Sequence, residues 1–458
     1  MRTNLIMTIL RFFVLGVILS LSLTINAMAQ VSFQWVTVGD PNNAVDTRVM
    51  NKGLCTTPGV VGCVGDMTTG YGSVGYEYQI AKHHVTMSQY AEFLNAVDPN
   101  GTNSLGLYDD RMEEFIIPEI PFDPSPAFTG GIDFDEDPNA MSGSKYSAKS
   151  GQENYPANYI SWASAARFVN WLSNGQGSGD TESGVYEMIP TTTSDPVPTR
   201  EPGSSIFLPS EDEFYKAAYY NPTLNGGTGG YTEYGVGNAA PIIEDPNGSG
   251  STSANHSQTD GVNGPSGDTY WQNSGGSFTH NQIYLTEVGA YSAATSYYGL
   301  FDVDGNARQW METSKENPFN ANQDLPISRG GSWLHGTDGS GASFRQARVF
   351  AAGSSDISSH LLGIRIAQAI FAEADFDKDG DVDGVDLAIW ETSYSVDAGA
   401  DTDGDGDSDG DDFLVWQQQF TGSLPLSAVT SVPEPSSVVL LFTLVATCGL
   451  CRQRRVAS

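Results

Sequence analysis

Two aspartate-rich segments near the C-terminal end of the sequence have the residue types and the spacing of a cation site. DFDKDGDVDGVDLAIW (375–390) recurs 26 residues later as DTDGDGDSDGDDFLVW (401–416). The repeated residues are Asp375, Asp377, Asp379, Asp381 and Asp386, around Gly380, and Asp401, Asp403, Asp405, Asp407 and Asp412, around Gly406. A loop of this kind, turned at its glycine, offers the roughly six to eight oxygens that calcium prefers. The sequence therefore predicts two calcium sites.

The charge of this segment is a second reason to expect a bound cation. Fourteen aspartates and one glutamate lie between positions 375 and 412 against a single lysine, in a chain whose net charge is −34. Carboxylates this close repel one another without an ion, so we expect metal binding and folding to occur together. A solvated acidic linker is the alternative, but the strict spacing and the matching Trp390 and Trp416 disfavour it. The acidic balance also argues against nucleic-acid binding, which needs clustered Lys and Arg.

The rest of the chain offers few other groups with the spacing of a catalytic or metal site. Its six histidines show no HxH or HxxxH pairing, and there is no GxSxG elbow, P-loop or dinucleotide fingerprint. Cys55 and Cys63 in CTTPGVVGC are predicted to form a disulfide in an exported protein. Free reactive thiols are the disfavoured alternative, because no His, Lys or Arg in this loop would lower a thiol pKa.

Helix and strand patterns indicate how the main part of the chain is built. We expect an opening strand in VSFQWVTVGD, and helices that begin after the caps Thr86, Ser161 and Ser210. Gln89 and Glu213 would complete two capping boxes. The apolar residues expected on buried faces are Val31, Phe33 and Trp35 in the strand, Met87, Tyr90, Ala91, Leu94 and Val97 in the first helix, and Trp162, Ala165, Ala166, Val169 and Leu172 in the second.

Both ends of the chain carry patterns typical of export. Residues 1–29 combine Arg2 and Arg11 with the apolar run FFVLGVILSLSL and the small-residue site AMAQ, which predicts a signal peptide cleaved near Gln30. The run is shorter than the roughly 20 residues of a membrane span, which disfavours a spanning helix. Residues 423–458 form a separate tail with VPEP, an apolar run and three arginines. We expect a secreted or cell-envelope protein, with membrane anchoring through the tail as an alternative.

Six motifs in residues 31–369 resemble, in order and spacing, the formylglycine-generating enzyme domain, also called the sulfatase-modifying factor. They are VTMSQYAEFLNAV, YPANYISWASAARFVNWLS, FLPSEDEFYKAAY, YGLFDVDGNARQW, SRGGSW and LGIRIA. The resemblance implies an α+β fold, similar to that of C-type lectins, with little regular structure and with bound calcium. Such a fold would account for long glycine-rich loops such as 222–282.

The resemblance also indicates where a catalytic centre would be. Family members that oxidise a sulfatase cysteine to formylglycine carry, after RGGSW, two cysteines that bind copper and activate oxygen. The matching position for the first cysteine is His335, and the second falls near Ser340. One imidazole and one hydroxyl do not replace the thiolate pair that selects Cu(I), so we expect neither copper nor oxidase activity. His335 stays a weak catalytic candidate beside the favoured interpretation, an exposed loop histidine.

Two further calcium sites are implied by the same resemblance. The first would use Asp302, the carbonyls of Gly305 and Ala307, and the side chain of Gln309. The second would use Asn255, His256, Asp268 and Tyr270. Gln309 stands where the family has glutamate, and the loss of one charge lowers the calcium affinity expected of the first site. The alternative is that these polar groups only cap buried turns.

The acidic repeat and the tail resemble two other families. Residues 372–422 resemble the dockerin type I repeat, because each loop ends in aspartate rather than glutamate and no helix pattern precedes either loop. That resemblance implies a small all-α, EF-hand-like calcium module, which in that family can dock onto a cohesin partner. The alternative is that this copy only spaces the main domain from its anchor. Residues 423–458 resemble the PEP-CTERM sorting signal, which implies handling by exosortase-type machinery.

Three functions are consistent with these residues. The favoured one is a non-catalytic domain at the cell envelope that binds a glycan or a peptide through an aromatic-rich surface. The aromatic residues considered for that surface are Tyr270, Trp271, Tyr297, Tyr298 and Trp333. One alternative is a divergent formylglycine-generating oxidase that acts on sulfatase cysteine. The other is an envelope assembly protein that contacts its partner through the dockerin-like repeat.

Overall fold

The computed structural model contains two compact units, Met1–Ile370 and Phe371–Ser458, here called the body and the small unit. It describes residues 30–48, 69–113, 130–188, 197–238, 254–256, 283–317, 320–334, 348–349, 359 and 361–421. The predicted signal peptide, the predicted Cys55–Cys63 disulfide and the predicted sorting tail lie outside these residues. Within them, no helix has both the length and the apolar character needed to cross a membrane.

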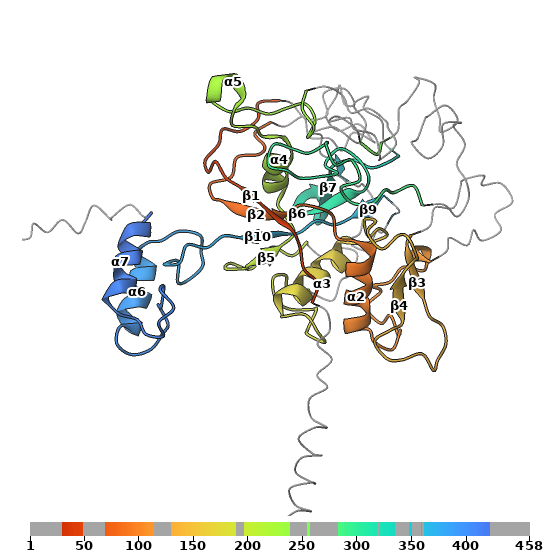
Figure 1. Cartoon of the computed structure of the whole chain (residues 1–458), viewed down its shortest axis with the longest axis horizontal. Coiled ribbons are helices and arrows are strands. Elements are labelled where there is room, and N and C mark those ends of the chain that lie inside the picture. Colours follow the sequence, from red (N-terminus) through yellow and green to blue (C-terminus); the bar gives the residue numbers. More distant parts are fainter. Residues whose placement is uncertain are drawn as a thin grey trace, which may run out of the picture. The chain divides into compact units, whose positions relative to one another are not determined.

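The first sheet joins the two ends of the body. Its strands lie in the order β1, β2, β10, β5, and each neighbouring pair is antiparallel (Figure 1). They span Trp35–Val38, Tyr78–Ala81, Ala367–Ala369 and Ile206–Phe207, respectively. The predicted opening strand therefore begins at Trp35 rather than at Val31, although Val31 is buried.

The second sheet places two of the sequence motifs side by side. Its order is β8, β7, β6, β9, with β6 antiparallel to β7 and parallel to β9. The strands are β6 (Arg308–Asn317), β7 (Asn320–Arg329), β8 (Arg348–Val349) and β9 (Leu362–Gly363), and a separate hairpin pairs β3 (Ile132–Phe134) with β4 (Tyr146–Ala148). Gln309 pairs with Arg329, so DVDGNARQW and SRGGSW meet at one end of the sheet.

The three predicted helices are confirmed together with their caps. They are α2 (Met87–Val97), α3 (Trp162–Ser173) and α4 (Glu211–Tyr219), while a 3-10 helix (Asp110–Met112) and α5 (Leu224–Gly227) lie in connecting segments. Thr86 and Ser210 form complete capping boxes, and the Ser161 hydroxyl accepts a backbone N–H of α3. These side chains satisfy backbone donors that a helix N-terminus otherwise leaves without a partner.

Helix α3 lies in the core of the body, and all of its residues except the last are buried. The indole of Trp162 donates to the Met311 carbonyl (2.8 Å), and the indole of Trp310 donates to the Ile160 carbonyl (2.9 Å). Two buried indoles therefore tie α3 to β6, and burial of each side chain contributes about 1.5–3 kcal/mol. The predicted buried faces of α2 and α3 are confirmed, except that Val97 is partly exposed.

The small unit is an internal duplication with one helix in each half. Helices α6 (Gly384–Ser393) and α7 (Gly410–Gln419) each follow one acidic loop. The indole of Trp390 donates to the Asp409 carbonyl (2.9 Å), and the indole of Trp416 donates to the Asp383 carbonyl (3.0 Å). The two tryptophans that the repeat predicted thus hold the start of each helix against the other half.

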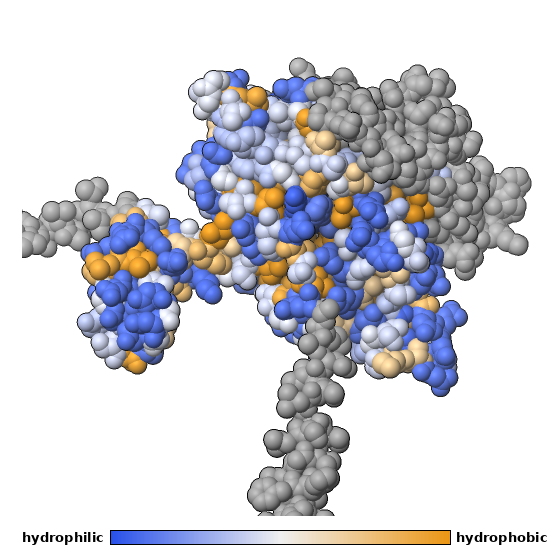
Figure 2. Space-filling model, viewed as in Figure 1, coloured by the Kyte–Doolittle hydropathy of each residue, from blue (hydrophilic) through white to orange (hydrophobic). Residues whose placement is uncertain are grey.

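The apolar core of the small unit is limited. Its buried cluster consists of Ala374, Val382 and Trp416. On the face shown in Figure 2, hydrophilic residues dominate this unit and surround a hydrophobic patch. Its exposed large apolar side chains are Val385, Tyr394, Val396 and Leu414. A unit with so little buried apolar surface needs another source of stability.

Candidate functional site

The acidic loops bring most of the predicted calcium ligands together. Carboxylate oxygens of Asp375, Asp377 and Asp386 lie within 4.8 Å of one another, as do those of Asp401, Asp403 and Asp412. A second group in each loop shares the last aspartate: Asp381 and Asp383 with Asp386, and Asp407 and Asp409 with Asp412. Asp379 and Asp405 belong to neither group, and their carboxylates accept the next aspartate's N–H. A single cation could contact several oxygens in each loop.

Left-handed backbone turns each loop back on itself. Gly380 (φ 101°) and Gly406 (φ 100°) occupy equivalent positions, as do Lys378 (φ 59°) and Gly404 (φ 76°). Glycine adopts this conformation without the steric cost that a Cβ adds. The turn brings the Gly380 N–H within 3.0 Å of the Asp375 carboxylate, which fixes the first aspartate of the loop.

The last aspartate of each loop also completes the capping box of the following helix, whose N-cap is Asp383 or Asp409. Asp386 is fully buried, and its two oxygens accept the N–H groups of Phe376 (2.6 Å) and Asp383 (2.8 Å). Asp412 makes the equivalent bonds at 2.6 and 2.7 Å. Because the same carboxylate faces the loop and caps the helix, an ion bound in the loop would be coupled directly to helix formation.

Burial and mutual repulsion shift the pKa values of these carboxyl groups. Burial raises the pKa of Asp375 to about 6, and the neighbouring Asp386 adds to the rise. Repulsion by Asp405 is the largest cause of the raised pKa of Asp407. For Asp412, burial raises the pKa, but hydrogen bonds from the loop backbone and Thr402 outweigh it and the net pKa is lowered. A divalent cation would favour the ionised form of all of them.

The first predicted body site lies in the turn before β6. Its members are Asp302, which is partly exposed, and Gly305, Ala307 and Gln309, which are buried. Asp302 has left-handed backbone (φ 54°), and its carboxylate accepts the Gly289 N–H (2.7 Å). The Ala307 carbonyl faces Nε2 of His84 at 2.9 Å. Protein donors therefore already contact two of the four groups.

The second predicted body site is described only in part. Asn255 and His256 are buried, whereas Asp268 and Tyr270 lie outside the described residues. The Asn255 amide donates to the Tyr284 carbonyl (2.9 Å) and to the side chain of Asn306 (3.2 Å). These contacts place Asn255 in a buried polar cluster that anchors the turn before β6.

The predicted aromatic surface needs one correction. Trp333 is only 2% exposed and stacks on Tyr284, with ring centroids 4.8 Å apart. It is a core residue of the body rather than part of an exposed surface. Tyr297 is 50% exposed, and the partly exposed Tyr298 beside it donates to the carboxylate of Asp40 (2.9 Å). Trp271 lies outside the described residues.

The arginine of SRGGSW forms a buried ion pair. Arg329 donates from Nε to Oε1 of Glu211 (2.9 Å), and both side chains are almost fully buried. Its guanidinium also lies 5.2 and 5.0 Å from the ring centroids of Tyr71 and Tyr215. The motif thus ties β7 to α4. The residues at the family's cysteine positions, His335 and Ser340, lie outside the described residues.

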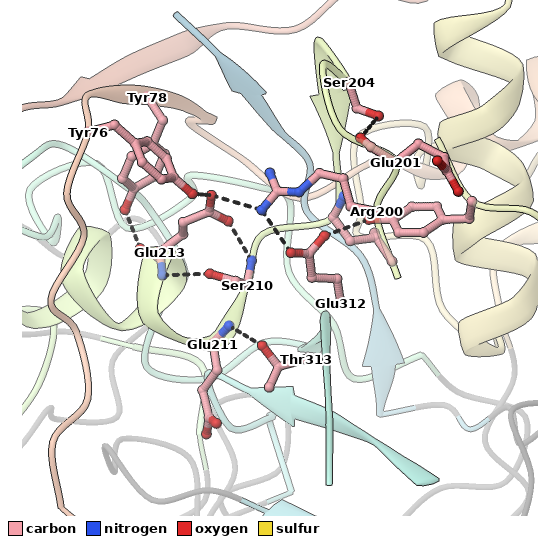
Figure 3. A network of polar contacts seen from close by, with 12 residues as sticks. Tyr76, Tyr78, Arg200, Glu201, Ser204, Ser210, Glu211, Glu213, Glu312 and Thr313 are labelled. Atoms are coloured by element: carbon pink, nitrogen blue, oxygen red, sulfur yellow. Dashed lines mark hydrogen bonds and ion pairs between the residues drawn. The ribbon is translucent and has the colours of Figure 1, made fainter. Parts of the chain in front are cut away.

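A network around Arg200, missed in the sequence, joins α4 to β6 (Figure 3). Arg200 donates to Glu312 (2.8 Å) and contacts Glu213 (3.3 Å) through the same nitrogen. The hydroxyl of Tyr76 donates to Glu213 (2.6 Å), and that of Tyr186 donates to Glu312 (3.1 Å). Two carboxylates therefore share one guanidinium in a largely buried setting.

Burial raises the pKa of Glu312 to about 7. The Arg200 charge lowers this pKa, and the second carboxylate, Glu213, raises it again. Such a group can hold or release a proton near neutral pH. The only sequence signal was the capping role of Glu213, since its partners come from distant segments.

The comparisons with known proteins identify the domain family. Among solved structures, the chain is similar to CarF (15% identical, TM-score 0.38, covering 74% of this chain and 99% of that chain). It is also similar to Treponema denticola variable protein 1 (16%, 0.35, 75% and 97%) and to PvdO from Pseudomonas aeruginosa (16%, 0.36, 73% and 94%). No curated protein matches it. Residues 73–370, more than half of the sequence, match the sulfatase-modifying factor enzyme 1-like domain, and the chain therefore belongs to this FGE-sulfatase family.

Proposed function

We propose that this chain is an exported, non-catalytic member of the family that binds a glycan or a peptide at the cell envelope. The observation that carries the proposal is the residue pair at positions 335 and 340, where histidine and serine replace the family's two cysteines. The chain has no other cysteine between Cys63 and Cys448. A soft thiolate pair is what selects Cu(I), so the chain lacks the ligands for the family's oxygen chemistry.

Ligand binding is supported by exposed aromatic surface on the body. Tyr297 is half exposed, and its ring packs edge-on against Tyr298 with centroids 5.2 Å apart. The hydrogen bond from Tyr298 to Asp40 holds this pair in place. A fixed aromatic pair with a nearby carboxylate suits contact with a sugar ring or a peptide side chain.

The second part of the proposal is that residues 372–422 fold around two calcium ions, as a dockerin-like module. Fourteen aspartates between positions 375 and 412 repel one another, and the fully buried apolar cluster of the described residues there is Ala374, Val382 and Trp416, with five partly buried apolar side chains packed against it. Bound cations would neutralise the repulsion and add to the stability that this small core gives. Exposed Val385 and Leu414 would be available to a cohesin-like partner.

The location follows from the two ends of the sequence. Residues 1–29 would direct export and be removed, and residues 423–458 would be recognised by exosortase-type sorting machinery. The protein would then be secreted or held at the cell envelope, anchored through the tail if the tail is retained.

The non-catalytic assignment is tested with a peptide that contains Cys-x-Pro-x-Arg. The mature chain is incubated with this peptide, copper and oxygen, and aldehyde is measured by mass spectrometry. We expect no product. Aldehyde formation that disappears in His335→Ala would overturn the proposal and identify a new ligand.

Ligand binding is tested on glycan and peptide arrays in the presence of calcium. We expect selective binding that Tyr297→Ala weakens and that Tyr394→Ala, an exposed tyrosine of the small unit, leaves unchanged. Absence of binding on both arrays would remove the support for this function. Capture of a partner through residues 372–422 alone, and only without chelator, would favour an assembly role instead.

A further inference from the structure

A buried guanidinium lies within the first predicted calcium site of the body. Arg365, in the motif LGIRIA, is fully buried and donates to Gln309 Oε1 (2.6 Å) and to the carbonyls of Ala81 (2.7 Å) and Phe301 (2.6 Å). Arginine keeps its charge in proteins, so these hydrogen bonds come from a cation. A cation supplied by the chain therefore contacts the Gln309 side chain of the predicted site.

The hydrogen bond from Arg365 fixes the orientation of the Gln309 amide. A guanidinium only donates, so the amide atom that faces it is the oxygen. The amide nitrogen then points to the opposite side, toward the Asp302 carbonyl at 3.4 Å. The same amide nitrogen lies close to Gly330, because a Cβ added to that glycine would be 2.8 Å from the nitrogen. Because an amide nitrogen is a donor, Gln309 presents hydrogens rather than a calcium ligand.

Two other groups of the predicted site also have protein donors. His84 is fully buried, and its Nε2 lies 2.9 Å from the Ala307 carbonyl. A carbonyl only accepts, so this nitrogen carries an N–H and donates it to Ala307. The Asp302 carboxylate accepts the Gly289 N–H. Three of the four groups are therefore engaged in hydrogen bonds.

Arg365 brings one positive charge to Gln309, whose amide is neutral. Of the four groups of the predicted site, Asp302 is the one with an ionisable side chain. Glutamate at position 309 would add a second carboxylate beside one guanidinium, and a buried excess charge of that kind needs a further cation.

We propose that the body binds no calcium at this position, because Arg365 and the Gln309 amide replace the ion. The turn before β6 would then keep its structure when calcium is removed. This inference does not depend on ligand binding by the body or on calcium binding by the acidic loops.

The test uses the full mature chain with both acidic loops disabled by Asp386→Ala and Asp412→Ala. Calcium binding is measured by isothermal titration, and the Tm of the body by calorimetry in calcium and in chelator. We expect that Asp302→Asn in this background removes no bound equivalent of calcium and does not reduce any rise in Tm that calcium gives. Loss of one bound equivalent in that variant, or loss of a rise of several degrees in Tm at calcium about 100-fold above its Kd, would overturn the proposal.

A second variant asks whether the Gln309 amide is what excludes the ion. In the same background, Gln309→Glu is expected to bind one more equivalent of calcium than the background chain, and its Tm is expected to rise when calcium is added. Gln368→Glu on β10 makes the same change from an amide to a carboxylate elsewhere in the body, and it is expected to bind no additional calcium. Failure of Gln309→Glu to bind calcium would also overturn the proposal. If the acidic loops bound no calcium, by contrast, this result would be seen only in the chain without the Asp386→Ala and Asp412→Ala changes.

Discussion

Replacement of Asp386 by asparagine should weaken calcium binding to the first acidic loop and leave the second loop intact. The fully buried Asp386 carboxylate belongs to two oxygen clusters, and its oxygens accept the N–H groups of Phe376 and Asp383. Asparagine has the same shape, but it keeps one oxygen and turns an NH₂ group toward one of these donors. The change therefore removes one charged ligand without creating a cavity.

The size of the effect follows from the contact that is lost. A hydrogen bond or ligand contact to a charged group contributes about 1.5–3 kcal/mol. At about 1.4 kcal/mol for each factor of ten, the calcium affinity of the first loop should fall by roughly tenfold to hundredfold. Because Asp386 also caps α6, the helix content of the small unit at limiting calcium should fall with it.

Isothermal titration and circular dichroism on the full mature chain measure both effects. Asp397→Asn is the matched control: it removes the same charge from the same unit, but its exposed side chain lies between the two loops and belongs to none of the carboxylate groups. We expect this control to change the affinity by no more than about threefold. If the two variants lost calcium affinity equally, binding would depend on the overall negative charge of the small unit rather than on the position of Asp386. That result would refute the assigned geometry.

Three further predictions concern the body. Burial raises the pKa of Glu312 to about 7, so the folded state binds this proton more tightly than the unfolded chain does. The contribution of Glu312 to stability is therefore fully present below about pH 4.5 and is lost as the pH rises through about 7. Glu312→Gln, which keeps a hydrogen-bond acceptor for Arg200, should therefore raise the free energy of unfolding at pH 8 by about 1–3 kcal/mol and flatten its pH dependence in denaturant titrations. Arg329→Met should cost about 3–5 kcal/mol by leaving Glu211 buried without its partner, and the double variant with Glu211→Met should recover most of that loss in thermal unfolding. Thr86→Ala should cost about 1 kcal/mol in the same measurement through loss of the α2 cap, and an equal stability would show that the capping box contributes nothing.

Local patterns predicted the helices well because their determinants lie within a few residues. The capping boxes at Thr86 and Ser210 and the buried face of α3 follow from spacing alone. The duplicated acidic loops were equally readable, since Gly380 and Gly406 mark the left-handed turn in each. In these segments the residues that decide the structure are neighbours in the chain.

The contacts missed in the sequence depend on distant segments. Arg200 meets Glu312 across 112 positions, and Arg365 meets Gln309 across 56, so no local pattern indicates either pair. Trp333 was placed on an aromatic surface because composition does not tell which side of a strand end faces the core. Tertiary packing decides that point, and it buries the ring against Tyr284.

The central claim, that this family member lacks the thiolate pair for copper chemistry, is tested most directly by Cu(I) titration. The mature chain is compared with its His335→Cys, Ser340→Cys variant, with Cys448 and Cys451 replaced by serine in both. We predict no tight stoichiometric Cu(I) in the unchanged loop and one equivalent in the variant. Tight stoichiometric binding by the unchanged loop, with consumption of oxygen in the presence of a cysteine peptide, would contradict the account.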